Sequence, residues 1–143
     1  MTTPKASLRR DKLKLSTVAK MLGYKQNWTL NHGWGTNNDG SDVLLHTVDL
    51  TTNKIIPFDP DLDDGHCFRM CLMMGLEPQI DKITQTVTIG YVSPLGNPSE
   101  MRSYINSFYG EGDPMPVVRR VALNAAYQLA IETLAKQERE RSN

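Results

Sequence analysis

Residues 116–136 constrain the fold of this chain more than any other segment. Their apolar side chains repeat at helical spacing in two stripes, and their polar side chains form one line spaced by four. The stripes are Val118, Val121, Ala122, Ala125 and Leu129, then Leu123, Tyr127, Ala130, Ile131 and Leu134, and the polar line is Arg120, Asn124, Gln128 and Glu132. A helix this apolar has most of its circumference covered. We expect one side to pack on a sheet and the other to meet a further helix or a second subunit.

Length and charge narrow the classes of protein to consider. The chain has 143 residues and a formal net charge of zero, which fits one domain and gives no general attraction to nucleic acid or to an anionic membrane. No apolar run approaches the ~18 residues that span a bilayer, and residues 1–14 lack the apolar stretch of a secretory signal. The two cysteines, Cys67 and Cys71, are too few for a disulfide framework. These features predict a protein of the reducing cytoplasm.

The pattern of the remaining segments predicts an α+β fold. We expect an antiparallel sheet of about four strands, packed in a sandwich-like way with two main helices and a short N-terminal helix. Residues 24–34 read as extended or irregular, and residues 99–109 could hold a short helix. The expected helices cover residues 16–22, 59–74 and 116–136, and the expected strands cover residues 43–50, 55–58, 80–83 and 86–92.

The chain reads as one domain with additions at both ends. Residues 1–14 form a basic flexible arm, residues 15–136 a single α+β domain with an insertion near residues 97–112, and residues 137–143 a charged tail. The arm carries several cations and one acid, so it could contact phosphate or an acidic partner. Its candidate nucleic-acid contacts are Arg9, Arg10, Lys12 and Lys14.

Three motifs carry a resemblance to a known family. They are "STVAKMLGYK", "IPFDPDLDDGHCFRMCLMMGL" and "DPMPVVRRVALNAA", which together mark residues 15–95 and 113–131. In these motifs the chain resembles the phage ABA-sandwich domain family, and Arg120 best matches the arginine of the family's C-terminal helix. The resemblance implies an α+β sandwich and a phage setting, and it implies no catalytic residue. The arm, the insertion and the tail depart from the family pattern.

No motif predicts catalysis, a metal or a cofactor. The acidic run before Gly65 has the wrong register for a calcium loop, and it opens a helix, where carboxylates favour the dipole. His66 lies about 100° around the helix from Cys67, so these two and Cys71 do not form a zinc site. The chain has no G-x-S-x-G, P-loop or G-x-G-x-x-G sequence. A pairing of cysteine with histidine in space stays open.

Arginines and aromatic residues are the better candidates for binding. Two arginines open the last helix, where free N–H groups suit a phosphate, and arginine beside aromatic rings suits a nucleotide or a protein partner. The candidate ligand-binding residues are Arg119, Arg120, Arg102, Tyr104, Tyr109 and Trp34. The alternative is that the aromatic rings cover a sheet edge and the arginines pair with nearby acids.

These candidates lead to three hypotheses. The first is a non-enzymatic phage accessory protein of the host cytoplasm, which counters host defence by sequestering a small nucleotide or by blocking a host protein. The second is a nucleic-acid-associated protein that uses the basic arm, although zero net charge argues against it. The third is a structural or virion interaction module. The second apolar stripe of the last helix also predicts a homo-oligomer, most simply a two-fold dimer.

Overall fold

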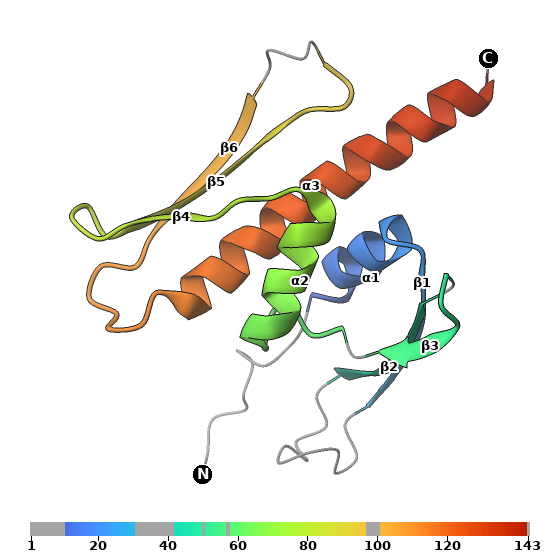
Figure 1. The fold of residues 1–143 in the computed structure, drawn as a ribbon, viewed down its shortest axis with the longest axis horizontal. Coiled ribbons are helices and arrows are strands. Elements are labelled where there is room, and N and C mark those ends of the chain that lie inside the picture. Colours follow the sequence, from blue (N-terminus) through green and yellow to red (C-terminus); the bar gives the residue numbers. More distant parts are fainter. Residues whose placement is uncertain (1–10, 31–41, 50, 57, 97–100, 143) are drawn as a thin grey trace. The chain divides into compact units, whose positions relative to one another are not determined.

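A computed structural model describes residues 11–30, 42–49, 51–56, 58–96 and 101–142 (Figure 1). These residues contain three helices and six strands, and the strands form two antiparallel sheets of three. The α+β class predicted from the sequence is confirmed, while six strands in two sheets replace the single sheet of about four. The chain divides into two compact units, Met1–Phe58 and Asp59–Asn143, where the sequence suggests one domain.

The first unit begins with helix α1 (Lys12–Met21). Asp11 caps this helix, because its side chain accepts a hydrogen bond of 3.1 Å from the Lys14 N–H. The cap starts the helix earlier than the predicted residue 16, so Lys12 and Lys14 are helical and do not belong to a flexible arm. The other two candidate arm residues, Arg9 and Arg10, lie outside the described residues.

The sheet of the first unit has the order β1-β2-β3. Its strands are β1 (Tyr24–Leu30), β2 (Asp42–Asp49) and β3 (Lys54–Ile56). The segment predicted as extended or irregular is therefore a regular strand over most of its length, interrupted by a shift of register between Asn27 and Trp28. Tyr24 and Phe58 are buried, and their rings meet edge to face with centroids 5.7 Å apart.

The sheet of the second unit has the order β4-β5-β6. Its strands are β4 (Gln79–Asp81), β5 (Thr86–Val92) and β6 (Met101–Ser107). Alternate residues of β5 are buried, as expected for a strand with one face toward a core. The short helix expected within residues 99–109 is wrong, since β6 pairs with β5 along its whole length.

Helix α2 (Asp64–Met74) ends where the sequence predicts and begins five residues later than the predicted residue 59. Asp63 caps it by accepting a hydrogen bond of 2.9 Å from the His66 N–H, and this bond keeps the pKa of the Asp63 carboxyl below its ordinary value. Gly75 ends it in the left-handed region, at φ 69°, which a residue without Cβ adopts at little cost. These two residues fix where the helix starts and stops.

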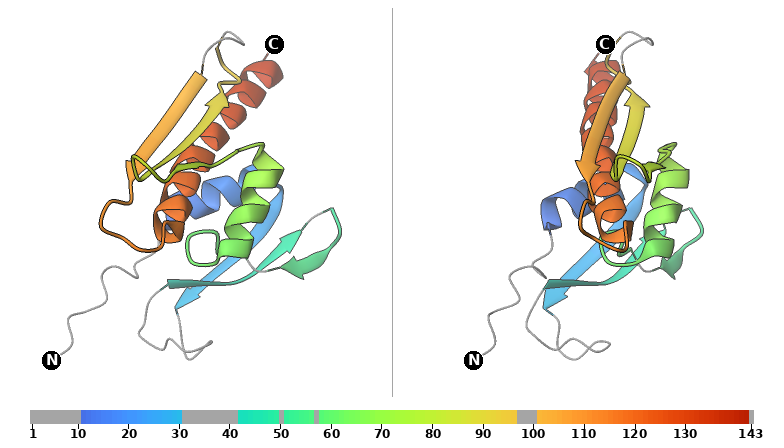
Figure 2. Two further views of the ribbon diagram at one scale, coloured as in Figure 1. Left: turned by 60° about the vertical axis from the view of Figure 1, so that its left-hand side comes forward. Right: turned by 90° about the vertical axis from the view of Figure 1, so that its left-hand side faces the viewer.

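Helix α3 (Met115–Ser142) is the central element of the second unit. It contacts α2, β5 and β6, and in Figures 1 and 2 it runs beside the β5–β6 ribbon. The fully buried residues along it include four alanines, whose small side chains let neighbouring elements approach closely: Ala122, Ala125, Ala126 and Ala130. Among the described helices, none is long and apolar enough to cross a membrane.

The end of α3 and its apolar surface differ from expectation. The helix continues to Ser142, so the charged tail predicted at residues 137–143 is helical as far as it is described, because Lys, Glu, Gln and Arg are strong helix formers. Most of the apolar side chains in the two stripes are buried within one chain, and Ile131 is 37% exposed. The second stripe, which motivated a dimer, is only partly covered: Leu123 and Ala130 are buried, Tyr127 and Leu134 are half-buried, and an oligomer through this helix stays a prediction.

Candidate functional site

A buried carboxylate of α3 holds two strands of the second unit. Glu132 is 5% exposed and accepts a hydrogen bond of 2.7 Å from the Tyr91 hydroxyl on β5. Its other oxygen, Oε1, accepts a hydrogen bond of 3.1 Å from Arg102 Nε on β6. The Nη2 atom of the same guanidinium also lies 3.1 Å from this oxygen. The rings of Tyr91 and Tyr104 stack with centroids 6.4 Å apart. We call Tyr91, Arg102, Tyr104 and Glu132 the Glu132 cluster.

The chemistry of the Glu132 cluster favours a structural role. Burial and the hydrogen bond to Glu132 raise the pKa of Tyr91 well above its ordinary value, so the phenol stays protonated and keeps donating. Two of the Arg102 nitrogens are committed to the same carboxylate. A guanidinium held in this way has less capacity for an incoming phosphate. The cluster joins β5 and β6 to α3.

Arg119 is likewise held by the chain itself. Its Nε donates to the Asp61 carbonyl oxygen at 3.2 Å, and its guanidinium forms a short ion pair with Asp64 in the first turn of α2. The pair links the N-terminal turns of α2 and α3. Arg120, the next residue, is exposed. The arginines at the start of α3 therefore do not converge on one ligand.

The candidate residues chosen from the sequence do not form one site. Arg102 and Tyr104 lie together in the Glu132 cluster, whereas Arg119 lies 13 residues before Glu132, about 20 Å along a helix. The side chain of Tyr109 is 84% exposed, beyond the end of β6. Trp34 lies outside the described residues.

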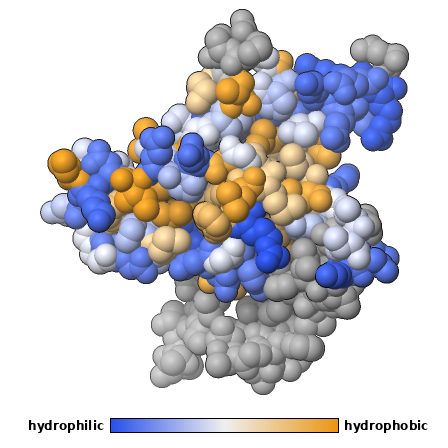
Figure 3. Space-filling view, viewed as in Figure 1, coloured by the Kyte–Doolittle hydropathy of each residue, from blue (hydrophilic) through white to orange (hydrophobic). Residues whose placement is uncertain are grey.

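Helix α2 carries an exposed apolar surface that was not predicted from the sequence. Its buried face contains Cys67, Met70, Cys71 and Met74, so the residues between them point the other way. Phe68 and Leu72, one turn apart, are each 66% exposed, and Met73 is 49% exposed. We call these three residues the α2 apolar face. Figure 3 shows hydrophobic atoms gathered over α2 and the neighbouring β4.

The spacing of α2 contained the signal for this surface. Once Cys67, Cys71 and Met74 are assigned to the core, Phe68 and Leu72 must lie on the far side of the same helix. The exposure of Phe68 and Leu72 was not predicted because both faces of the helix are apolar, and a helix that is apolar all round is expected to be fully buried.

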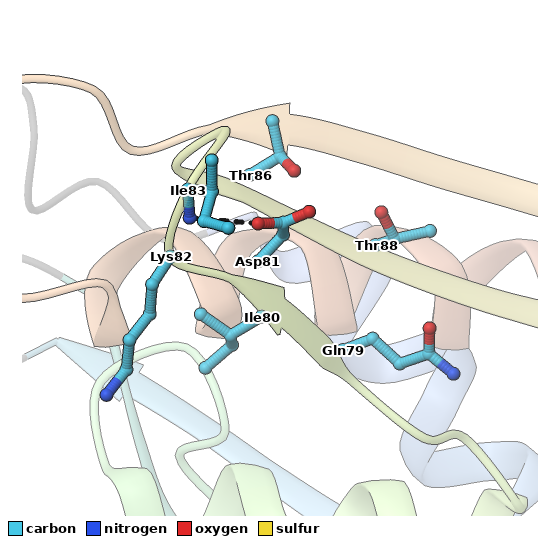
Figure 4. A pocket seen from close by; sticks show the side chains of 7 residues that line it. All are labelled: Gln79, Ile80, Asp81, Lys82, Ile83, Thr86 and Thr88. Atoms are coloured by element: carbon cyan, nitrogen blue, oxygen red, sulfur yellow. Dashed lines mark hydrogen bonds between the residues drawn. The ribbon is translucent and has the colours of Figure 1, made fainter.

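A shallow hollow of about 510 Å³ lies at the β4–β5 hairpin (Figure 4). The acid that lines it, Asp81, is occupied by its own turn: one carboxylate oxygen accepts from the N–H groups of Ile83 at 2.9 Å and Thr84 at 3.2 Å. These bonds keep the pKa of Asp81 below its ordinary value. The carboxylate of this hollow is therefore committed to its own turn, and the other charged residue of the lining is Lys82.

The two cysteines are buried on α2 and free of disulfides. The hydrogen bond to Cys71, together with burial, raises the pKa of the Cys67 thiol, so it stays protonated near neutral pH and is a poor nucleophile. Among the residues that the structure describes, no three His, Cys, Asp or Glu side chains come together as a metal site.

The comparisons with known proteins yield no relative for this chain: no family model, no curated protein and no solved structure matches it. The resemblance to the phage ABA-sandwich family therefore stays a prediction.

Proposed function

We propose that this chain is a non-enzymatic binding protein that recognises another protein through the α2 apolar face. In the phage setting that the family resemblance implies, it acts in the host cytoplasm as an accessory protein that blocks a host protein of the defence machinery. The observation that carries the proposal is the exposure of Phe68 and Leu72, 66% each, on one face of a well-formed helix.

Leaving the large apolar side chains of Phe68 and Leu72 in contact with water costs free energy, which a bound partner would recover. Burying a Phe or Leu side chain contributes about 1.5–3 kcal/mol relative to leaving it exposed, so these two offer a partner a substantial gain. Single exposed apolar residues are common, but a cluster of them on one helix face is typical of an interaction surface. An aromatic side chain next to aliphatic ones suits an anchor that fills a pocket.

Of the two binding modes predicted from the sequence, this geometry favours a protein partner over a nucleotide. A nucleotide site needs cations free to meet phosphate, and the two arginines best placed for it are held by Glu132 and Asp64. Releasing either arginine for a ligand would leave a carboxylate without its partner. An apolar helix face, by contrast, needs no rearrangement before a protein can dock.

Capture of partners from a bacterial host with active defences tests the proposal. The full chain serves as bait beside the double variant Phe68→Ser/Leu72→Ser, and Tyr109→Ser is the matched control because it removes an exposed aromatic ring elsewhere in the same unit. We expect one host protein to be retained by the unmodified chain and by the control, and lost with the double variant.

Two other results would argue against binding through this face. Retention that survives the double variant but fails with Tyr109→Ser would move the site to the end of β6. A chain that releases a bound nucleotide on denaturation, and retains no host protein, would instead support sequestration of a small ligand.

A further inference from the structure

The outer edge of β6 pairs with no strand among the residues that the structure describes. β6 is an outer strand of its sheet, paired with β5 over seven residues without a bulge (Figure 2). It contains no proline, and its one charged residue, Arg102, is turned toward Glu132. The opposite edge, β4, has three residues. A long, regular edge without such protection is a template for another strand.

The hydrogen bonds of the ladder show which groups of β6 point outward. The Phe108 N–H donates to the Gln85 carbonyl at 2.9 Å, and bonded pairs alternate with non-bonded pairs along an antiparallel ladder. Tyr104 therefore faces β5 with its backbone groups, whereas the groups of Met101, Ser103, Ile105 and Ser107 point away. The outward N–H of Ser107 is satisfied by the Asn106 side chain at 2.9 Å. The outward backbone groups of Met101, Ser103 and Ile105 remain to pair with another strand, and these three residues are arranged symmetrically about Ser103.

We propose that β6 pairs with β6 of a second copy, antiparallel, about a two-fold axis at Ser103. In this register Met101 of one copy lies opposite Ile105 of the other, and Ser103 lies opposite Ser103. Every outward N–H and C=O group of the three residues then finds a partner. The two sheets join into one continuous sheet across the axis.

The side chains suit this register. Met101 and Ile105 are 63% and 67% exposed, and each meets the other across the axis on the same face of the sheet. On the opposite face, Arg102 lies across from Tyr104, where a guanidinium beside an aromatic ring is favourable, and no like charges meet. A register centred on Tyr104 would need the Ser107 N–H, which is already bonded. Because the pattern is self-complementary, the partner that pairs with the β6 edge is a second copy of this chain.

Sedimentation of the full chain over a range of concentrations tests this pairing. Ser103→Pro removes an N–H that bonds to none of the described residues of the single chain, and Ile105→Lys adds an exposed charge to the edge. We expect each change to raise the dimer dissociation constant at least about tenfold. Ile83→Lys is the matched control, because Ile83 is 94% exposed in the β4–β5 turn, and it should leave the constant unchanged.

A cross-link identifies the register itself. Residues opposite one another in a bonded antiparallel pair have Cα atoms about 5.5 Å apart, so a short bis-thiol-reactive reagent should join Ser103→Cys to its counterpart in a covalent dimer and should not join Ile83→Cys. A chain that stays monomeric at all concentrations overturns the proposal, as does a dimer that is unaffected by Ile105→Lys but is lost with Ile131→Lys on α3. A monomer whose edge binds an extended peptide of a different protein also overturns it.

Discussion

Replacing Glu132 by alanine should weaken the second unit more than any surface substitution on the same helix. Glu132 is 5% exposed, and the variant leaves the buried Tyr91 hydroxyl without its acceptor, 2.7 Å away in the native chain. A hydrogen bond to a charged group contributes about 1.5–3 kcal/mol. The Arg102 contacts add less than about 1 kcal/mol, because that side chain is 45% exposed and regains water. We expect a total loss of about 3 kcal/mol in the free energy of unfolding.

Urea unfolding followed by two probes measures this loss. Helical circular dichroism reports mainly on the second unit, which contains α2 and α3, whereas both tryptophans fall within residues 1–58 and report on the first unit. The exposed Glu138 on α3 provides the control, and Glu138→Ala should change stability by no more than about 0.5 kcal/mol. The decrease for Glu132→Ala should be visible in the helical signal.

A double-mutant cycle separates the hydrogen bond from the general effect of removing a side chain. Tyr91→Phe alone should cost about 1–2 kcal/mol, and the two changes together should cost less than their sum, with a coupling of about 1.5 kcal/mol. A Glu132→Ala variant within about 0.5 kcal/mol of the native chain, or a coupling near zero, would refute the view that this carboxylate joins β5 and β6 to α3.

Three further predictions follow from the same geometry. Folding raises the pKa of Tyr91, so above about pH 10 the unfolded chain loses the phenol proton before the folded chain does. The free energy of unfolding should therefore fall with pH more steeply in the native chain than in Tyr91→Phe, by up to about 1.4 kcal/mol per pH unit. Equal slopes in urea titrations at alkaline pH would contradict this. Gly75→Ala forces a Cβ into the left-handed region and should cost about 1 kcal/mol in thermal or urea unfolding, and no loss would show that the helix end relaxes. Because Cys67 and Cys71 are both buried, they should react slowly with a thiol reagent in the native chain at pH 8 and rapidly in denaturant, and rapid native labelling would place them at the surface.

Local signals in the sequence predicted the parts of the fold that local forces determine. The acidic run before α2 and Gly75 after it mark both ends of that helix, since capping depends on residues within one turn. The β-branched run of residues 86–92 gives β5 its observed bounds. In α3 the first apolar stripe correctly indicated a covered face, since four of its five residues are buried.

The failures involve interactions between residues distant in the sequence. The apolar spacing in residues 99–109 suits a helix, but β6 is a strand because it pairs with β5 and because Arg102 is drawn to Glu132, thirty residues later. The sequence left open whether the candidate arginines bind a ligand or pair with acids, because it does not show that Asp64 lies beside Arg119. The α2 apolar face was missed because its residues are as apolar as those of a core.

Photo-cross-linking from inside host cells tests protein binding through the α2 apolar face most directly. A photoreactive phenylalanine analogue is placed at Phe68 in one variant and at Tyr109 in another, since both side chains are exposed and aromatic. We predict a discrete adduct with one host protein from position 68 and none from position 109. An adduct from position 109 alone would contradict the proposed function. So would the absence of an adduct from position 68 in cells whose defence the chain blocks.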